Sequence, residues 1–237
     1  MPKKLSIIIP VYNESKSVLR CLQNISSLYI PNYLKEIIVV DDGSTDNSLY
    51  LIEQFKTSNK YTKIISLPKN SGKGYAVKEG IRHATGDIMI IQDSDLEYDP
   101  HDILLILKKY ENKNCNVVYG SRILGSKIYG NKNAGMIFYI GGVTLTKLMN
   151  LLFGTNLTDQ PTCYKSWKHT LSKDLIKYCQ SKGFEFEIEM TAFFAKENVI
   201  EEVPINYYPR SVENGKKITL TDFILSVLTA FRCKLLK

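Results

Sequence analysis

The sequence predicts an α/β fold: a mainly parallel sheet flanked by helices. Three observations lead to this prediction. Short apolar runs alternate with helical segments, turn residues separate them, and 237 residues suffice for one large domain with a substantial core. Strands joined in this way need right-handed crossovers, and ligands of such sheets bind beyond the carboxyl ends of the strands.

In the first half of the chain, each expected strand is followed by a turn and then by a helix. The strands are continuous runs of Ile, Val and Leu, typical of strands buried on both faces. We expect strands at residues 5–10, 36–40, 63–67 and 87–91, and helices at about 13–28, 47–56 and 74–83.

The second half is less regular. We expect helices at about 101–110, 135–152, 171–179 and 187–196, and strands at 116–119, 163–167 and 200–203. Residues 125–135 are rich in Gly, Asn and Lys and predict a mobile loop. Apolar residues recur at helical spacing in 219–237, which predicts a C-terminal amphipathic helix after a domain of residues 1–218.

Polar motifs follow the expected strands at one edge of the sheet, at residues 10–14, 41–46, 70–74 and 93–97. Alternate residues of a strand point the same way, so Asp93 and Asp95 are expected to face one divalent cation, with Glu97 joining them. An isolated Asp-x-Asp is also typical of a solvated acidic turn, but its place among the other motifs favours a site. Mg²⁺ and Mn²⁺ usually share their oxygen ligands with a substrate diphosphate, which makes nucleotide chemistry the first hypothesis.

Composition excludes several classes of protein. Apolar residues at 44% and charged residues at 23% argue against disorder, and the net charge of +7 suits an anionic partner. The sequence contains no recognition helix, zinc finger or RNP-like aromatic signature, so we expect no nucleic acid. Five cysteines without a Cys-x-x-Cys pair predict neither a disulfide framework nor a zinc site, and a cytoplasmic location fits best.

No signal sequence or membrane span is expected. The apolar run at residues 5–11 is too short for a signal peptide. Two later segments, 134–154 and 220–236, are interrupted by Lys147 and Asn150 and by Arg232 and Lys234, so neither reaches the ~20 uninterrupted apolar residues of a spanning helix.

Several motifs together resemble family 2 glycosyltransferases. They are Pro-Val-Tyr-Asn-Glu at 10–14, Val-Asp-Asp-Gly-Ser-Thr-Asp at 40–46, Asn-Ser-Gly-Lys-Gly at 70–74, Asp-Ser-Asp-Leu-Glu at 93–97 and Gly-Ser-Arg at 120–122. Within that family the chain is most similar to the dolichyl- and polyprenyl-phosphate sugar synthases, such as the dolichol-phosphate mannose synthases. The resemblance implies a GT-A fold and inverting transfer of a mannose- or glucose-type sugar from a GDP- or UDP-linked donor to a polyprenyl or dolichyl phosphate, with Mg²⁺ or Mn²⁺.

The resemblance also implies roles for individual residues. Asp95 is the main metal ligand, with Asp93 and Glu97 binding directly or through water. Arg122 and Arg210 grip the acceptor phosphate and the donor diphosphate, since a guanidinium fits phosphate oxygens. Asp159 binds sugar hydroxyls or orients Arg122, and the catalytic set is Asp95, Arg122, Asp159 and Arg210. The donor-binding set is Pro10, Tyr12, Glu14, Asp41, Asp42, Ser44, Lys73, Asp93 and Ser94.

Alternatives remain for these residues and for the reaction. Each arginine is also compatible with a surface ion pair, and Ser44 or Asp46 with helix capping. A transferase acting on a sugar hydroxyl of a glycan or capsule precursor would need a base, from Asp159 or from the carboxylates at 185–189. A non-catalytic sugar-nucleotide-binding module is disfavoured by the intact Asp93/Asp95 pair. The C-terminal helix either packs on the core or lies in the headgroup layer, as a peripheral contact with the cytoplasmic face of a membrane; a membrane partner is the other route to that surface.

Overall fold

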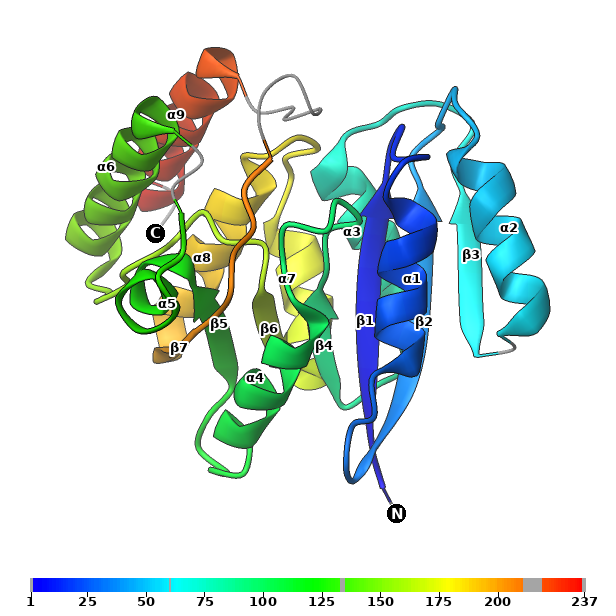
Figure 1. Cartoon of the computed structure of the whole chain (residues 1–237). Coiled ribbons are helices and arrows are strands. Elements are labelled where there is room, and N and C mark those ends of the chain that lie inside the picture. Colours follow the sequence, from blue (N-terminus) through cyan, green and yellow to red (C-terminus); the bar gives the residue numbers. More distant parts are fainter. Residues whose placement is uncertain (1, 60, 133–134, 211–218, 236–237) are drawn as a thin grey trace.

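The computed structural model describes residues 2–59, 61–132, 135–210 and 219–235. Its centre is a seven-stranded sheet in the order β3-β2-β1-β4-β6-β5-β7 (Figure 1). Strand β6 pairs antiparallel with β4 and β5, and the remaining pairs are parallel. The strands are β1 Lys3–Val11, β2 Tyr33–Asp41, β3 Thr62–Ser66, β4 Ile88–Ile91, β5 Val117–Ser121, β6 Lys165–Lys168 and β7 Ile200–Pro204.

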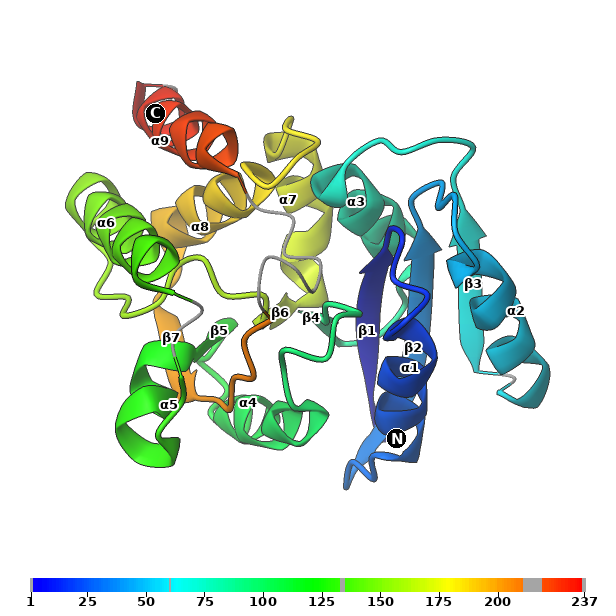
Figure 2. The same cartoon turned by 45° about the horizontal axis from the view of Figure 1, so that its top comes forward.

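Helices cover both faces of this sheet (Figures 1 and 2). They are α1 Val18–Ser27, α2 Ser48–Ser58, α3 Lys73–His83, α4 Ile103–Lys109, α5 Arg122–Tyr129, α6 Met136–Phe153, α7 Ser172–Tyr178, α8 Phe186–Glu197 and α9 Leu220–Leu235, with short 3-10 turns at Pro100–Asp102 and His169–Leu171. The mixed α/β prediction is therefore confirmed.

The main core lies around β1, whose Ile7, Ile8 and Ile9 are fully buried. Both faces of the strand are covered, which explains its lack of polar alternation. Helix α3 lies close to β1 because Gly80 has no side chain: a Cβ there would lie 2.4 Å from Ile8 Cγ2. This close contact places the N-terminus of α3 at the carboxyl edge of the sheet.

Two local predictions are wrong. Helix α1 begins at Val18 rather than near residue 13, because the chain first makes a turn in which Asn13 has a φ of +49°. The mobile loop predicted at 125–135 is helical up to Tyr129. Gly125 serves close packing there, since a Cβ on it would lie 1.9 Å from Ile205 O, and Ser121 Oγ caps the helix by accepting from Leu124 N at 3.0 Å.

A second apolar cluster lies between α6, α8 and α9, which sit side by side in Figure 2. From α9 it takes small residues: Ala230 and Cys233 are buried in it, and Ser226 and Thr229 are buried beside them. Of the predicted apolar stripe, Phe223 and Val227 pack against the cluster, whereas Leu220, Ile224, Leu228 and Phe231 are exposed. The helix thus packs on the fold through a face of small residues and turns large apolar side chains outward.

The basic end of α9 contacts the protein itself. Arg232 forms an ion pair with Glu189 of α8, and Lys234 Nζ donates to Leu152 O at the end of α6. Two of the basic side chains at this end of the helix are therefore held by the protein itself, and Lys237 lies outside the described residues. Contrary to the expectation from its interruptions, α6 is long and apolar enough to cross a membrane by length and composition, and only 22% of it is buried.

Candidate active site

A cleft of about 530 Å³ opens at the carboxyl edge of the sheet. Its walls come from the ends of β1 and β2, the segment after β4, the N-termini of α3 and α8, and α9. Most predicted site residues meet there. Those lining the cleft are Pro10, Tyr12, Glu14, Asp42, Lys73, Asp93, Ser94, Asp95, Glu97, Arg122 and Arg210.

The paired aspartates after β2 have separate positions. Asp42 lines the cleft, and its two carboxylate oxygens accept from Ser71 N and Gly72 N, at 2.8 Å each. Asp42 therefore ties the 70–74 loop to the end of β2. Burial raises its pKa, although these two backbone hydrogen bonds lower it. Asp41 is 1% exposed and does not line the cleft, so the structure does not bring it to the predicted donor site.

The predicted donor residue Ser44 also lies outside the cleft lining. Its hydroxyl accepts from Asn13 N at 3.0 Å, and its own N–H donates to Asp41. Asp46 accepts from Ser48 N at 2.9 Å at the start of α2, but the capping position itself is Asn47, so neither Ser44 nor Asp46 is the cap that the alternative predicted. The hydroxyl of Ser44 thus joins the turn after β1 to the turn after β2.

The acidic segment 93–97 is not an extension of β4. The strand ends at Ile91, and Leu96 adopts a φ of +65°, so strand alternation does not orient these carboxylates. Asp93 pairs with Lys73 at 2.9 Å, and Asp95 pairs with Arg210 at 2.9 Å. Both face the cleft, as predicted, but for a different geometric reason.

Glu97 also lines the cleft, but its carboxylate is bound to other residues. Its carboxylate accepts from Tyr207 Oη at 2.8 Å and from Arg210 N at 2.9 Å. Among the described residues, no three His, Cys, Asp or Glu side chains converge as a metal-binding group. The structure thus contradicts the expected three-carboxylate arrangement, because Glu97 holds the segment that carries Arg210.

The remaining pair still fits a divalent cation. Within the residues that the structure describes, the carboxylates of Glu14, Asp93, Asp95 and Glu97 lie around two cationic side chains, Lys73 and Arg210. Burial, together with the charges of Asp93 and Glu97, raises the pKa of Asp95 to about 7 despite Arg210. A divalent cation would neutralise this negative excess, and carboxylate oxygens are its preferred ligands.

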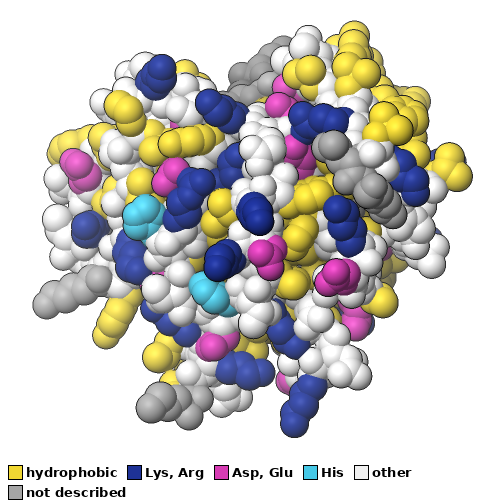
Figure 3. Space-filling view, turned by 180° about the vertical axis from the view of Figure 1, so that it is seen from behind, with side chains coloured by type: hydrophobic (Ala, Val, Ile, Leu, Met, Phe, Trp, Pro, Cys, Tyr) yellow, Lys and Arg dark blue, Asp and Glu magenta, His cyan; other side chains and the backbone are white. Residues whose placement is uncertain are grey.

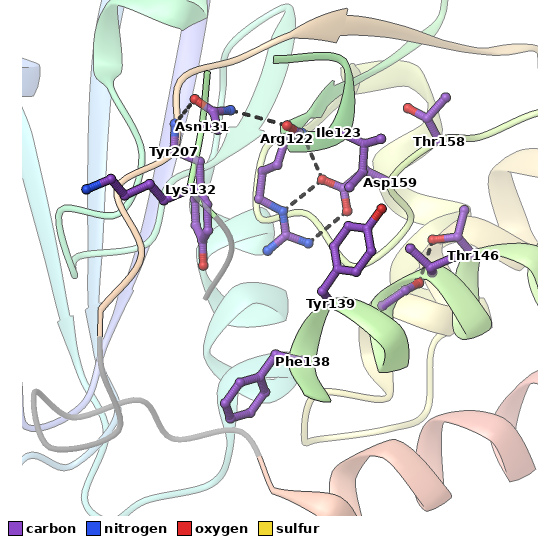
Figure 4. Close-up of a pocket in the computed structure, with 12 residues that line it drawn as sticks. Arg122, Ile123, Asn131, Lys132, Phe138, Tyr139, Thr146, Thr158, Asp159 and Tyr207 are labelled. Atoms are coloured by element: carbon purple, nitrogen blue, oxygen red, sulfur yellow. Dashed lines mark hydrogen bonds and ion pairs between the residues drawn. The ribbon is translucent and has the colours of Figure 1, made fainter. Parts of the chain in front are cut away.

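Arg122 is fixed by Asp159 (Figure 4). Its Nε and Nη2 donate to the two oxygens of Asp159 at 2.8 Å each, and Nη2 also donates to Pro161 O. Asp159 is 4% exposed, and its amide donates to Glu202. Of the two roles considered for Asp159, the geometry matches the orientation of Arg122.

A smaller cavity of about 70 Å³ adjoins Arg122 on the side of α6. Phe138 and Tyr139 from α6 and the exposed Lys132 line it, and Figure 4 shows them around the guanidinium. Tyr207 borders both cavities, with its ring centroid 5.1 Å from Arg122 Cζ. Arg122 therefore stands between the main cleft and a recess lined by both apolar and polar side chains.

Sequence reasoning missed Lys165 next to the cleft and considered its partner Glu187 only as a candidate base. Lys165 of β6 is fully buried and pairs with Glu187, which lies at the N-terminus of α8 and lines the cleft. Glu187 also pairs with Lys73. The available signal was a lysine inside an otherwise buried short strand, which requires a partner.

Comparison with known proteins identifies the family. The model of glycosyl transferase family 2 matches residues 6–175. The chain belongs to this family. A curated relative, the low-salt glycan biosynthesis hexosyltransferase Agl6 of Haloferax volcanii, is 27% identical over 212 residues, which cover 88% of this chain and 49% of the relative. The chain thus spans about half the length of that relative.

Solved structures of glucosyl-3-phosphoglycerate synthase from Mycobacterium tuberculosis share the fold. The complex with UDP superposes with a TM-score of 0.71 at 17% identity, covering 98% of this chain and 79% of that one. The complex with Mn²⁺, UDP-glucose and glycerol 3-phosphate gives 0.71 at 16% identity, covering 98% and 80%. The predicted GT-A architecture of a family 2 glycosyltransferase is confirmed.

Proposed function

We propose that this chain transfers a hexose from a nucleoside diphosphate sugar to a polyprenyl phosphate, with Mg²⁺ or Mn²⁺ as cofactor. Family membership supports the glycosyl transfer. The hexosyltransferase activity in the name of the Haloferax relative supports a hexose, and the Mn²⁺ or Mg²⁺ with UDP in the mycobacterial complexes supports the donor and the cation. A mannose or a glucose on GDP or UDP fits this proposal.

The observation that carries the acceptor assignment is the position of Arg122. Its guanidinium lies between the cleft, where the acidic pair is, and the recess lined by Phe138 and Tyr139 of α6. A phosphate on Arg122 would have the donor on one side and the aromatic rings of Phe138 and Tyr139 on the other. A polyprenyl phosphate has that combination of an anionic head and an apolar chain.

Further apolar side chains lie on the outside of the protein. On α6 and α9, large apolar side chains are between 51% and 76% exposed: Met136, Ile137 and Ile140 in the first turns of α6 and Leu220, Ile224 and Leu228 along the first nine residues of α9. The two helices touch there, since a Cβ on Gly141 would lie 3.7 Å from the ring of Phe223. Figure 3 shows apolar side chains gathered at the upper right, where α9 lies by its place in Figure 1.

This surface leads us to place the chain on a membrane, at its cytoplasmic face. Single exposed apolar residues are ordinary on soluble proteins, but a contiguous group usually marks an interaction surface. An interfacial contact buries such side chains in the headgroup layer and needs no spanning segment. Alternatively, a membrane protein partner binds the same surface.

In the proposed reaction, an acceptor phosphate oxygen attacks the anomeric carbon of the sugar. The bond from that carbon to the diphosphate breaks, the nucleoside diphosphate leaves with the electron pair, and attack from the opposite face inverts the configuration. When bound, the divalent cation neutralises the charge that develops on the diphosphate. The lipid phosphate is already ionised near neutral pH, so no strong general base is required.

The residues then have distinct tasks. Asp95 and Asp93 would hold the cation, and Arg210, whose Nη2 lies 2.9 Å from Asp95 Oδ2, would contact the diphosphate. Arg122, fixed by Asp159, presents its guanidinium to the acceptor phosphate. The alternative of a hydroxyl acceptor is less well matched, because two of the candidate bases, Asp159 and Glu187, are held in ion pairs.

The test is an acceptor panel. The purified protein is incubated with GDP- and UDP-linked mannose and glucose, Mn²⁺, and in turn a polyprenyl phosphate, phosphoglyceric acid and a neutral oligosaccharide, with products identified by mass spectrometry. We expect a phosphate-linked sugar on the lipid. Transfer only to phosphoglyceric acid or only to the oligosaccharide would overturn the acceptor assignment.

A further inference from the structure

Four alternating charges form a chain from the interior of the protein to the cleft. They come from four elements: Lys165 of β6, Glu187 of α8, Lys73 of α3 and Asp93 after β4. Lys165 Nζ lies 3.0 Å from one oxygen of Glu187, and Lys73 Nζ lies 2.9 Å from the other. Lys73 then reaches Asp93, also at 2.9 Å.

Only the inner member of this chain is remote from any substrate. The side chain of Lys165 is fully buried, whereas those of Lys73 and Asp93 are 17% and 21% exposed and line the cleft. Lys165 also donates to Thr162 O, and its ammonium lies 5.2 Å from the centroid of the Tyr119 ring. Its ammonium is thus enclosed by protein groups and acts on the cleft only through Glu187.

A buried pair of this kind is a poor source of stability. The desolvation of two charges offsets most of their attraction, and apolar residues of the same size often serve as well. Burial lowers the pKa of Lys165. Burial alone would raise the pKa of Glu187, but Lys165 and Lys73 lower it to about 2, so the carboxylate stays charged. A charged Glu187 can attract and hold the next charged group in this row, the one that reaches the cleft.

This next group is the ammonium of Lys73, whose position depends on its neighbours. It is the first residue of α3, and the preceding Gly72 is held to Asp42. Gly74 brings this helix end against α8, since a Cβ on it would lie 2.5 Å from Phe186 Cβ. The flexible lysine side chain could still point elsewhere, but Glu187 and Asp93 hold its ammonium over the Phe184 ring, 5.7 Å from the centroid.

We infer that Lys165 and Glu187 are positioning residues that hold the Lys73 ammonium in the cleft as a contact for the donor diphosphate. Lys73 is then the group that touches substrate, and Lys165 acts only through Glu187. This inference rests on the proposed nucleotide-sugar donor. It concerns donor binding alone and is independent of the acceptor.

The test is a double-mutant cycle on nucleotide affinity. UDP and GDP binding with Mn²⁺ is measured by calorimetry, without acceptor, for wild type, Lys73→Met, Lys165→Met and the double variant. Methionine keeps the length of the side chain and removes the charge. We expect Lys73→Met and Lys165→Met each to weaken binding by at least about tenfold, the size of one hydrogen bond to a charged group.

The double variant decides between positioning and a general structural role. If Lys165 acts through Lys73, the Lys165→Met change has little further effect once Lys73 is methionine. Equal losses in both backgrounds, or wild-type affinity of Lys165→Met, would overturn the inference. Glu187→Gln gives a second cycle with Lys73→Met if Lys165→Met does not fold.

Glu189→Gln is the matched control. Glu189 follows on the same helix, is 2% exposed, pairs with Arg232 and does not line the cleft, so its loss should lower thermal stability and spare nucleotide affinity. If the wild type binds UDP or GDP but does not modify a lipid phosphate, the acceptor assignment is refuted. The roles of Lys165 and Glu187 are then still decided by the double-mutant cycle. A wild type that binds neither nucleotide refutes both.

Discussion

At the scale of single residues, the cleft is built from charges that fix one another. Arg122 binds Asp159 through two nitrogens and Pro161 through its carbonyl, while Arg210 spans Glu14 and Asp95. These partners hold two planar cations in one cleft. The arginines therefore arrive oriented, which reduces the entropy lost when a phosphate binds.

This geometry predicts that Arg122→Lys is a severe change. A lysine ammonium cannot bond both oxygens of Asp159 and still present a planar edge to a phosphate. We expect transfer to the lipid phosphate to fall at least about tenfold, which corresponds to ~1.4 kcal/mol of transition-state stabilisation. Arg82→Lys, at an exposed pair with Glu79 on α3, is the control and should keep the wild-type rate. An Arg122→Lys enzyme as fast as the control would show that the guanidinium has no role in transfer.

A second residue-scale prediction concerns Glu36 and acid stability. Its buried carboxylate meets Lys4 and Lys63 at 2.9 Å each, Ser6 Oγ at 2.5 Å and Thr85 N at 2.8 Å. Burial alone would raise its pKa, but these hydrogen bonds lower it from 4.5 to about 2. Because the folded-state pKa is the lower one, the carboxylate stabilises the fold above pH 4.5 and loses that effect as the pH falls toward 2.

Glu36→Gln should therefore lower the free energy of unfolding at pH 7 by about 1–3 kcal/mol. The difference from wild type, measured by urea unfolding at a series of pH values, should shrink below pH 4.5 and disappear near pH 2. Glu53→Gln on the exposed side of α2 should have no such profile. A pH-independent difference would mean that Glu36 contributes through its shape rather than its charge.

At the scale of elements, apolar runs and turn residues predicted each strand within a few residues. The two errors arose where long-range packing overrides local chemistry. Gly125 looked like a loop residue, but its missing side chain admits the Ile205 carbonyl. The helical turn at Asn13 is replaced by a tight turn that delivers residues 10–14 to the cleft. The pattern of apolar residues along the sequence indicates neither the packing of Gly125 nor the turn at Asn13.

Helix α9 also explains why a deletion would be a poor test of membrane binding. Ala230 and Cys233 belong to the apolar cluster with α6 and α8, so removing 219–237 should expose that cluster and destabilise the fold. Substitution of exposed residues separates the two roles. Ile224→Ser with Leu228→Ser should leave thermal stability nearly unchanged and reduce co-sedimentation with anionic liposomes several-fold.

The control for this prediction is Tyr61→Ser, at a residue that is 84% exposed, on the loop before β3 and far from α9 in sequence. It should bind liposomes as wild type does. If the α9 double variant also binds liposomes as wild type does, the outward apolar face of α9 contacts something other than lipid, such as a protein partner. Loss of stability in the double variant would instead place these side chains in the core.

At the scale of the whole molecule, the order of elements brings segments distant in sequence to one edge of the sheet. The sequence predicted which segments meet there, because strand ends of a parallel sheet share an edge. It did not predict how their charges pair. Glu97 was grouped with Asp93 and Asp95 by spacing, yet it binds Tyr207 and the Arg210 amide, a contact across more than a hundred residues. Such pairing is decided by tertiary structure, as is the Lys165–Glu187 pair.

The central claim is that this cleft binds a nucleoside diphosphate and a divalent cation together through Asp95. The most direct measurement is calorimetric binding of UDP and GDP to wild type and Asp95→Ala, with Mn²⁺ and with excess chelator. Asp95 lies at the cleft surface, so its truncation opens no core cavity and the variant should remain folded. We predict tight binding of at least one nucleotide to wild type with Mn²⁺, and a loss of at least about tenfold on chelation or in Asp95→Ala, where Mn²⁺ has no further effect. Equal nucleotide affinity in all four conditions would contradict the account.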